Sequence, residues 1–133
     1  MDEFKEEDAK RKLEEEYEKA KKLLNDKDKV EEFLKKVEEK IATIQKLGDT
    51  LSNVPTMISL VRSYIKKDYL EVPSETITFV LSALLYVFNP FDIVPDTLSE
   101  DGYLDDDMVI TVCLKLVSND MEEYRKWREN HNL

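Results

Sequence analysis

The chain has few of the residues that cross-link or punctuate small folds: one cysteine, two glycines and four prolines among 133 residues. A single cysteine excludes a disulfide within the chain and a zinc site built from several cysteines. The scarcity of glycine and proline argues against turn-rich all-β folds and against collagen-like or disordered chains. A chain of this length fits one domain with a substantial core.

Positive charge is also in short supply, since 20 Lys and Arg face 30 Asp and Glu and leave a net charge of −10. Most of the excess lies in residues 89–107, which contain seven acids and no base. A nucleic-acid-binding chain is expected to carry a basic patch that neutralises phosphates, and none is visible. We therefore expect no nucleic-acid partner, and an anionic membrane surface would also repel this balance.

No apolar run reaches the length of a membrane span. The longest is Ile77–Phe88, twelve residues that include Thr78 and Ser82, whereas a spanning helix needs about 20. A buried core helix is the better interpretation, and a membrane-dipping segment is the minority alternative. The acidic N-terminus lacks the apolar run of a signal peptide, so the sequence predicts a cytoplasmic location.

Apolar residues recur at helical spacing through most of the chain, without the alternation of a strand. The spacing predicts helices over residues 3–24, 29–47, 54–67, 74–88 and 105–130. The fourth is apolar nearly all round, so it should be covered by the others. The predicted fold class is all-α, a single-domain bundle of four to five helices with a central apolar helix.

The first helix carries only a narrow apolar stripe on a highly charged cylinder. The stripe consists of Leu13, Tyr17, Ala20 and Leu24. We therefore predict a loosely packed, charged N-terminal helix in residues 1–28 and a helical domain in residues 29–133. The exposed stripe is then one candidate surface for a partner.

One region carries a specific motif. Residues 86–96 read YVFNPFDIVPD and residues 102–106 read GYLDD. This pattern resembles the YkvA family, a bacterial helical domain of unknown function whose apolar helix ends in Y-x-x-x-P-x-D-x-x-P-D before G-Y-x-D-D. The matching positions are Tyr86, Pro90, Asp92, Pro95, Asp96, Gly102, Tyr103, Asp105 and Asp106. The resemblance spans residues 30–130 and implies a fold and a motif rather than an activity.

Two flanking features, Arg62-Ser63-Tyr64 and the segment Glu123–Trp127, also look like those of the family. One departure lies between the two halves of the motif. Members carry an apolar, proline-containing stretch there, whereas residues 97–101 read TLSED and are polar and acidic. If family members use that stretch to touch a membrane, this chain should do so poorly.

The motif carries four carboxylates, and their role has two interpretations. They are Asp92, Asp96, Asp105 and Asp106. In the structural interpretation, Asp92 and Asp96 accept hydrogen bonds from backbone N–H groups as turn or cap residues between the two prolines, and either Asp105 or Asp106 caps the last helix. In the alternative, all four bind Mg²⁺ or Ca²⁺, with or without catalysis. A cluster of this kind needs a positive group nearby, which Arg62 or Arg125 could supply through folding.

The remaining residues with reactive or binding side chains do not form a standard catalytic motif. Cys113 and Trp127 fall on an apolar face, which predicts core residues, and His131 near the C-terminus is predicted to be solvated. No nucleophile–base pair is evident, so an enzyme is not favoured. The leading function is a non-enzymatic interaction or scaffold domain with an unknown protein partner or with itself. Divalent-cation binding and peripheral membrane association are the alternatives.

Overall fold

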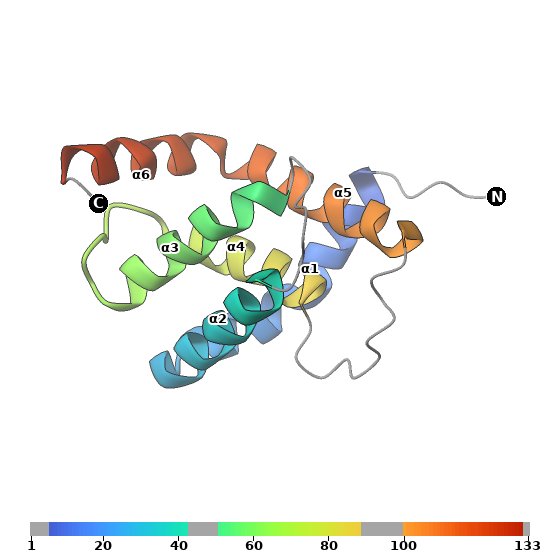
Figure 1. Ribbon diagram of the computed structural model, residues 1–133, viewed down its shortest axis with the longest axis horizontal. Coiled ribbons are helices and arrows are strands. Elements are labelled where there is room, and N and C mark those ends of the chain that lie inside the picture. The colour runs from blue at the N-terminus through green and yellow to red at the C-terminus, as the bar shows by residue number, and fades with distance from the viewer. Residues whose placement is uncertain (1–5, 43–50, 89–99, 132–133) are drawn as a thin grey trace.

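The computed structural model describes residues 6–42, 51–88 and 100–131, with the backbone alone for residues 51 and 100–107. Within these ranges the chain forms six α-helices and one short 3₁₀ turn (Figure 1). They are α1 (Glu6–Leu24), α2 (Lys27–Ala42), η1 (Leu51–Asn53), α3 (Val54–Ile65), α4 (Ser74–Val87), α5 (Glu100–Leu116) and α6 (Ser118–Asn130). The all-α prediction is confirmed, but the described helices outnumber the four to five predicted.

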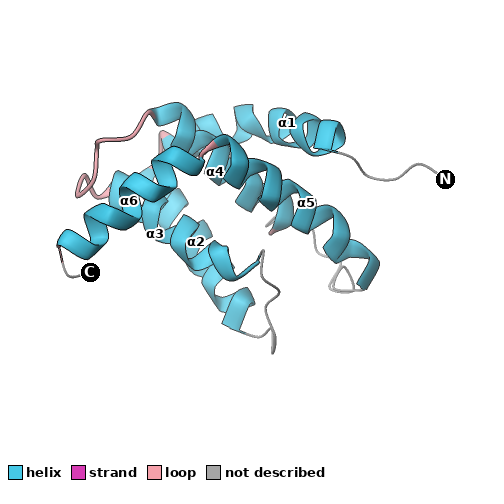
Figure 2. Ribbon diagram, turned by 90° about the horizontal axis from the view of Figure 1, so that it is seen from above, coloured by secondary structure: helices cyan, strands magenta, loops and turns pink. Residues whose placement is uncertain are grey.

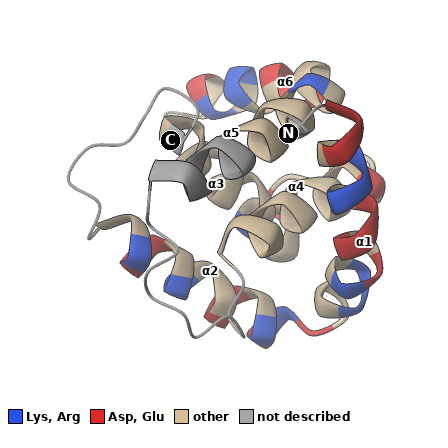
Figure 3. Ribbon diagram, turned by 90° about the vertical axis from the view of Figure 1, so that its right-hand side faces the viewer, with Lys and Arg blue, Asp and Glu red and all other residues tan. Residues whose placement is uncertain are grey.

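The apolar helix α4 lies at the centre, as predicted. Figure 3 shows charged residues on the surrounding helices, while α4 carries almost none. Nine of its side chains are buried, including Thr78 and Ser82. The Thr78 hydroxyl donates to the Ser74 carbonyl at 2.8 Å, and the Ser82 hydroxyl donates to the Thr78 carbonyl at 2.7 Å. These bonds satisfy the buried hydroxyls without a partner outside the helix.

The prediction that the N-terminal helix is loosely packed is wrong. Helix α1 lies along α4 and α5 (Figure 2), and Ala9, Leu13 and Ala20 are fully buried. The ring centroid of Tyr17 lies 5.2 Å from that of Phe79. Two of the three buried residues are alanines, whose small side chains allow close approach between helices. Helix α1 therefore shares one core with the helices that follow residue 28.

The predicted last helix is two helices that meet at Val117. The backbone there has φ −113° and ψ 19°, outside the helical range. The polar residues that follow, beginning with Ser118, favour the start of a new helix. Leu116, the last residue of α5, is 51% exposed. Helix α5 also begins at Glu100 rather than at residue 105.

Helix α3 ends in a Schellman motif with a lysine at the left-handed position. Lys67 has a φ of 64°. Its N–H donates to the Tyr64 carbonyl at 3.0 Å, and the Asp68 N–H donates to the Ser63 carbonyl at 2.9 Å. Glycine is the usual residue at this position, because a Cβ atom disfavours left-handed backbone.

We expect Lys67→Gly to raise the free energy of unfolding by about 0.5–1 kcal/mol, since glycine relieves this strain and keeps both hydrogen bonds. Urea denaturation measures the change. Lys66→Gly is the matched control, because Lys66 has right-handed backbone (φ −84°, ψ −3°). Glycine there should lower stability. An equal effect at both positions would contradict a strained Lys67.

Candidate functional site

The structure does not bring the predicted carboxylates together as a described site. Asp92 and Asp96, together with Pro90 and Pro95, lie outside the described residues. Gly102, Tyr103, Asp105 and Asp106 lie within the first two turns of α5. Because that helix begins at Glu100 and an N-cap precedes the first helical residue, neither Asp105 nor Asp106 is its cap. That part of the capping interpretation is wrong.

Cation binding by these four carboxylates stays a prediction. Among the residues whose side chains the structure describes, no group of three or more His, Cys, Asp or Glu is arranged to hold a metal ion. Tyr86, the first residue of the motif, is half-buried near the end of α4 and packs against the core.

Arg62, expected as a partner for those acids, instead links α3 to α2. Its Nε lies 3.1 Å from both carboxylate oxygens of Glu31, and its two terminal nitrogens donate to Glu38 at 3.2 and 2.7 Å. Hydrogen bonding to Glu38 and then to Glu31 raises the pKa of Arg62, and the same bond lowers the pKa of the Glu38 carboxyl. One cation thus bonds two anions. Arg125 contacts Glu122 and Asn53.

A chain of three hydroxyls joins α6 to α3. The Tyr124 hydroxyl is hydrogen bonded to Ser59 and, at 2.9 Å, to Ser63, and the Tyr124 side chain is buried. The two family-like flanking features therefore meet here. Sequence reasoning missed Ser59, although a serine one helical turn before Ser63 was a usable signal.

An aromatic cluster extends this contact towards the end of α6. The Trp127 ring centroid lies 5.1 Å from that of Tyr69, 5.8 Å from that of Tyr124 and 4.6 Å from that of His131. Trp127 is half-buried against the core, and His131 is exposed as predicted. Packing contacts therefore account for the positions of both Trp127 and His131.

Cys113 is a core residue, as predicted. Its thiol is fully buried and donates to the Phe79 carbonyl at 3.5 Å. Burial raises the pKa of the thiol to about 12. The reactive form of cysteine is the thiolate, so this environment suppresses nucleophilic chemistry at neutral pH.

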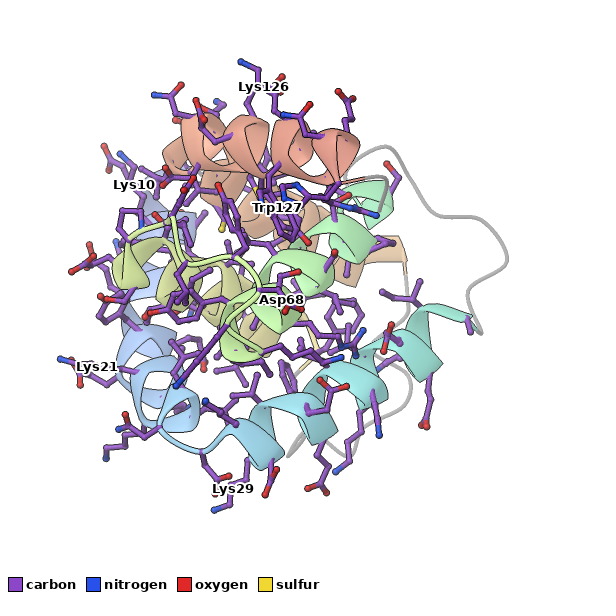
Figure 4. All side chains as sticks on the ribbon, turned by 90° about the vertical axis from the view of Figure 1, so that its left-hand side faces the viewer. Lys10, Lys21, Lys29, Asp68, Lys126 and Trp127 are labelled. Carbon is purple, nitrogen blue, oxygen red and sulfur yellow. The ribbon has the colours of Figure 1, made fainter. Side chains whose placement is uncertain are left out.

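A groove of about 450 Å³ runs along α3 beside α2. Figure 4 looks onto this side, where α3 crosses between α2 and α6. The lining residues are Glu38, Ile41, Ala42, Pro55, Ile58, Ser59, Arg62, Ser63, Lys66 and Asp68. Those from α3 recur at helical spacing, so they form one face of that helix. Apolar side chains line one part of the groove, and the polar residues described above line the rest.

Two comparisons with known proteins bear on the chain. Residues 76–112, which include most of α4 and α5, match a family described as a protein of unknown function (DUF1232). The chain is also 28% identical over 78 residues to the uncharacterized membrane protein YkvA of Bacillus subtilis (strain 168). That alignment covers 59% of this chain and 74% of the relative. No solved structure matches.

These findings first define the class: an all-helical protein with a match to a family of unknown function. They also bear out the resemblance to YkvA, as a similarity over part of the chain. In the part of the chain that the structure describes, no helix combines the length and the apolar character needed to cross a bilayer.

Proposed function

We propose that the chain is a non-enzymatic interaction domain whose binding site is the groove along α3. One observation carries this proposal: an open groove with an apolar part sits beside polar groups that are already bonded to one another. Ala42 and Pro55 are exposed and Ile41 is half-buried along this groove. Binding sites commonly combine an apolar lining with a few fixed polar groups.

The polar groups act as a frame for this groove. Arg62 joins α3 to α2 through two carboxylates, and Tyr124 joins α6 to α3 through two serines. Hydrogen bonds of this kind hold the walls in place before a partner arrives. A rigid site loses less conformational entropy on binding, which favours affinity.

Cysteine and histidine are common catalytic residues, and the chain has one of each. The environments of both side chains support a non-catalytic role. The lone cysteine is buried with a raised pKa. The lone histidine packs on Trp127, and its Nδ1 lies 2.8 Å from the Trp127 carbonyl oxygen. Neither side chain lines the groove. The groove therefore offers a surface for recognition rather than a described nucleophile–base pair.

The test uses anilinonaphthalenesulfonate, a small apolar dye that fluoresces when it binds apolar surface. We expect the folded protein to bind the dye and Ala42→Trp, which fills the groove, to weaken binding about tenfold, equivalent to about 1.4 kcal/mol. Glu39→Trp is the matched control, because Glu39 is exposed beside the groove but does not line it. Unchanged dye binding by Ala42→Trp would overturn the proposal.

A cytoplasmic location is also part of the proposal, supported by a single buried cysteine without a disulfide. The Bacillus subtilis relative is described as a membrane protein, which favours peripheral membrane association as a second candidate. Co-sedimentation with phosphatidylcholine vesicles, which carry no net charge to repel an acidic chain, tests that candidate. A chain that stays in the supernatant at low salt would exclude it.

A further inference from the structure

We propose that Arg62 is a latch that holds the last turn of α2, residues 38–42, in place as one wall of the groove along α3. When the bonds of Arg62 to Glu38 break, this turn opens while the rest of the fold stays intact. The opening itself requires no ligand. Its effect on binding rests on the proposed function, because the turn lines the proposed binding site.

The last turn of α2 has little apolar anchorage. The buried side chains of α2 all precede this turn; they are Val30, Phe33, Leu34 and Val37. Within the turn, Glu38, Glu39 and Ala42 are exposed, and Ile41 is half-buried against the core. Figure 4 shows the end of α2 at the outer edge of the molecule. Helix ends with few buried apolar contacts are the parts of a fold that open most readily.

Arg62 reaches this turn with a fork of two hydrogen bonds. Its two terminal nitrogens donate to the two carboxylate oxygens of Glu38 at 3.2 and 2.7 Å. Paired bonds between an arginine and a carboxylate are stronger than a single contact. The Arg62 side chain is 23% exposed, so solvent screens this pair less than a fully exposed one. The pair therefore stabilises a turn that apolar burial leaves weakly held.

Glu31 keeps Arg62 in position when the turn opens. The Nε atom of Arg62 donates to Glu31 at 3.1 Å. Glu31 lies two turns before Glu38, in the part of α2 that carries the buried side chains. Opening of the last turn thus breaks the two bonds to Glu38 and leaves the guanidinium bound to a fixed part of the helix. The turn can close again onto a partner that has not moved.

The opposite wall of the groove is held more firmly. The buried side chains of α3 are Val54, Met57, Ile58, Leu60, Val61 and Ile65. The Tyr124 hydroxyl also bonds Ser59 and Ser63 and ties α3 to α6. The last turn of α2 is therefore the wall that moves. Because Glu38, Ile41 and Ala42 line the groove from this turn, its opening removes that wall.

Native-state amide hydrogen exchange, resolved by residue with NMR, measures the opening. Glu38→Gln removes the charge that Arg62 binds and keeps the length of the side chain. We expect the amides of residues 40–42 to exchange about fivefold faster than in the unchanged chain, after correction for intrinsic rates, because the charged pair is lost. Amides of α4 and of the buried part of α2 should keep their rates.

Glu39→Gln is the matched control, because it makes the same replacement at an exposed position of the same turn. Both variants remove one negative charge near the C-terminal end of α2, so they share any effect on the helix dipole. Glu39→Gln should change the exchange rates of residues 40–42 by less than about twofold. Equal acceleration by both variants would overturn the latch, as would acceleration that extends to α4.

Arg62→Met tests the latch from α3. The substitution lies on a different helix, yet it should speed exchange of the same α2 amides. In the double variant with Glu38→Gln, the combined effect should be smaller than the sum of the two, because both substitutions remove one interaction. Fully additive effects would contradict a direct bond between the two side chains as the latch.

Dye binding separates the latch from the proposed function. Saturating anilinonaphthalenesulfonate should slow exchange of residues 40–42 in Glu38→Gln, because a ligand of the groove favours the state that keeps both walls. Faster exchange in Glu38→Gln that the dye does not slow would retain the latch and overturn the groove as the binding site. Unchanged exchange in Glu38→Gln, with dye binding lost in Ala42→Trp, would overturn the latch and retain the groove.

Discussion

Leu13→Ala is expected to lower the free energy of unfolding by about 2–4 kcal/mol. Leu13 belongs to the most polar-looking third of the chain, yet its side chain has no exposed surface and faces the core that α4 and α5 share. Removing it leaves a cavity, because the flanking Ala9 and Ala20 are too small to fill the space. Chemical denaturation followed by circular dichroism measures the loss.

Glu14→Ala is the control for this substitution. Glu14 is exposed on the same helix, so its replacement should change stability by less than about 0.5 kcal/mol. A loss below about 1 kcal/mol in Leu13→Ala would restore the picture of a loosely packed N-terminal helix.

By the same reasoning, removal of residues 1–24 should abolish cooperative unfolding, since it uncovers α4.

The sequence underestimates α1 because alanine contributes little to a hydrophobic pattern. Ala9 and Ala20 are as fully buried as Leu13, but their value lies in allowing the backbones to approach rather than in apolar area. The all-round apolar character of residues 77–88 was the better guide. A helix without a polar face must be covered by other helices on every side. The helices after residue 28 leave part of α4 uncovered, and α1 covers that part.

The break between α5 and α6 was hidden by continuous periodicity. Cys113, Val117, Met121 and Tyr124 are buried at steps of helical spacing on both sides of the break. A single residue with altered φ and ψ redirects the axis and leaves that spacing intact. The clue was local: Ser118 begins a run of polar residues that commonly start a helix.

The groove could not be predicted from motifs, since its lining comes from separate helices. Glu31 and Glu38 lie two turns apart on α2, and only the packing of α3 against α2 brings Arg62 to both. The family-like features around Arg62 and Tyr124 pointed to residues that hold the walls of the groove, but the sequence offered no physical reason for their presence. The hydrogen bonds of the Tyr124 hydroxyl to α3 supply the physical reason.

The second large effect is expected in the central helix. Leu81→Ala and Leu84→Ala should each lower the free energy of unfolding by about 2–5 kcal/mol, because both side chains have no exposed surface. Leu85 is 8% exposed, so its replacement should cost somewhat less. Such losses are a large part of the roughly 5–15 kcal/mol of unfolding free energy that is typical of folded domains.

Leu116→Ala is the matched control, since the same side chain is removed from a position that is 51% exposed. Less apolar surface returns to water there and no enclosed cavity forms, so the cost should stay below about 1 kcal/mol. The difference between the two classes of leucine isolates burial from side-chain chemistry. If the α4 substitutions cost no more than Leu116→Ala, the apolar helix would face a surface, and an apolar partner such as a bilayer would have to cover it.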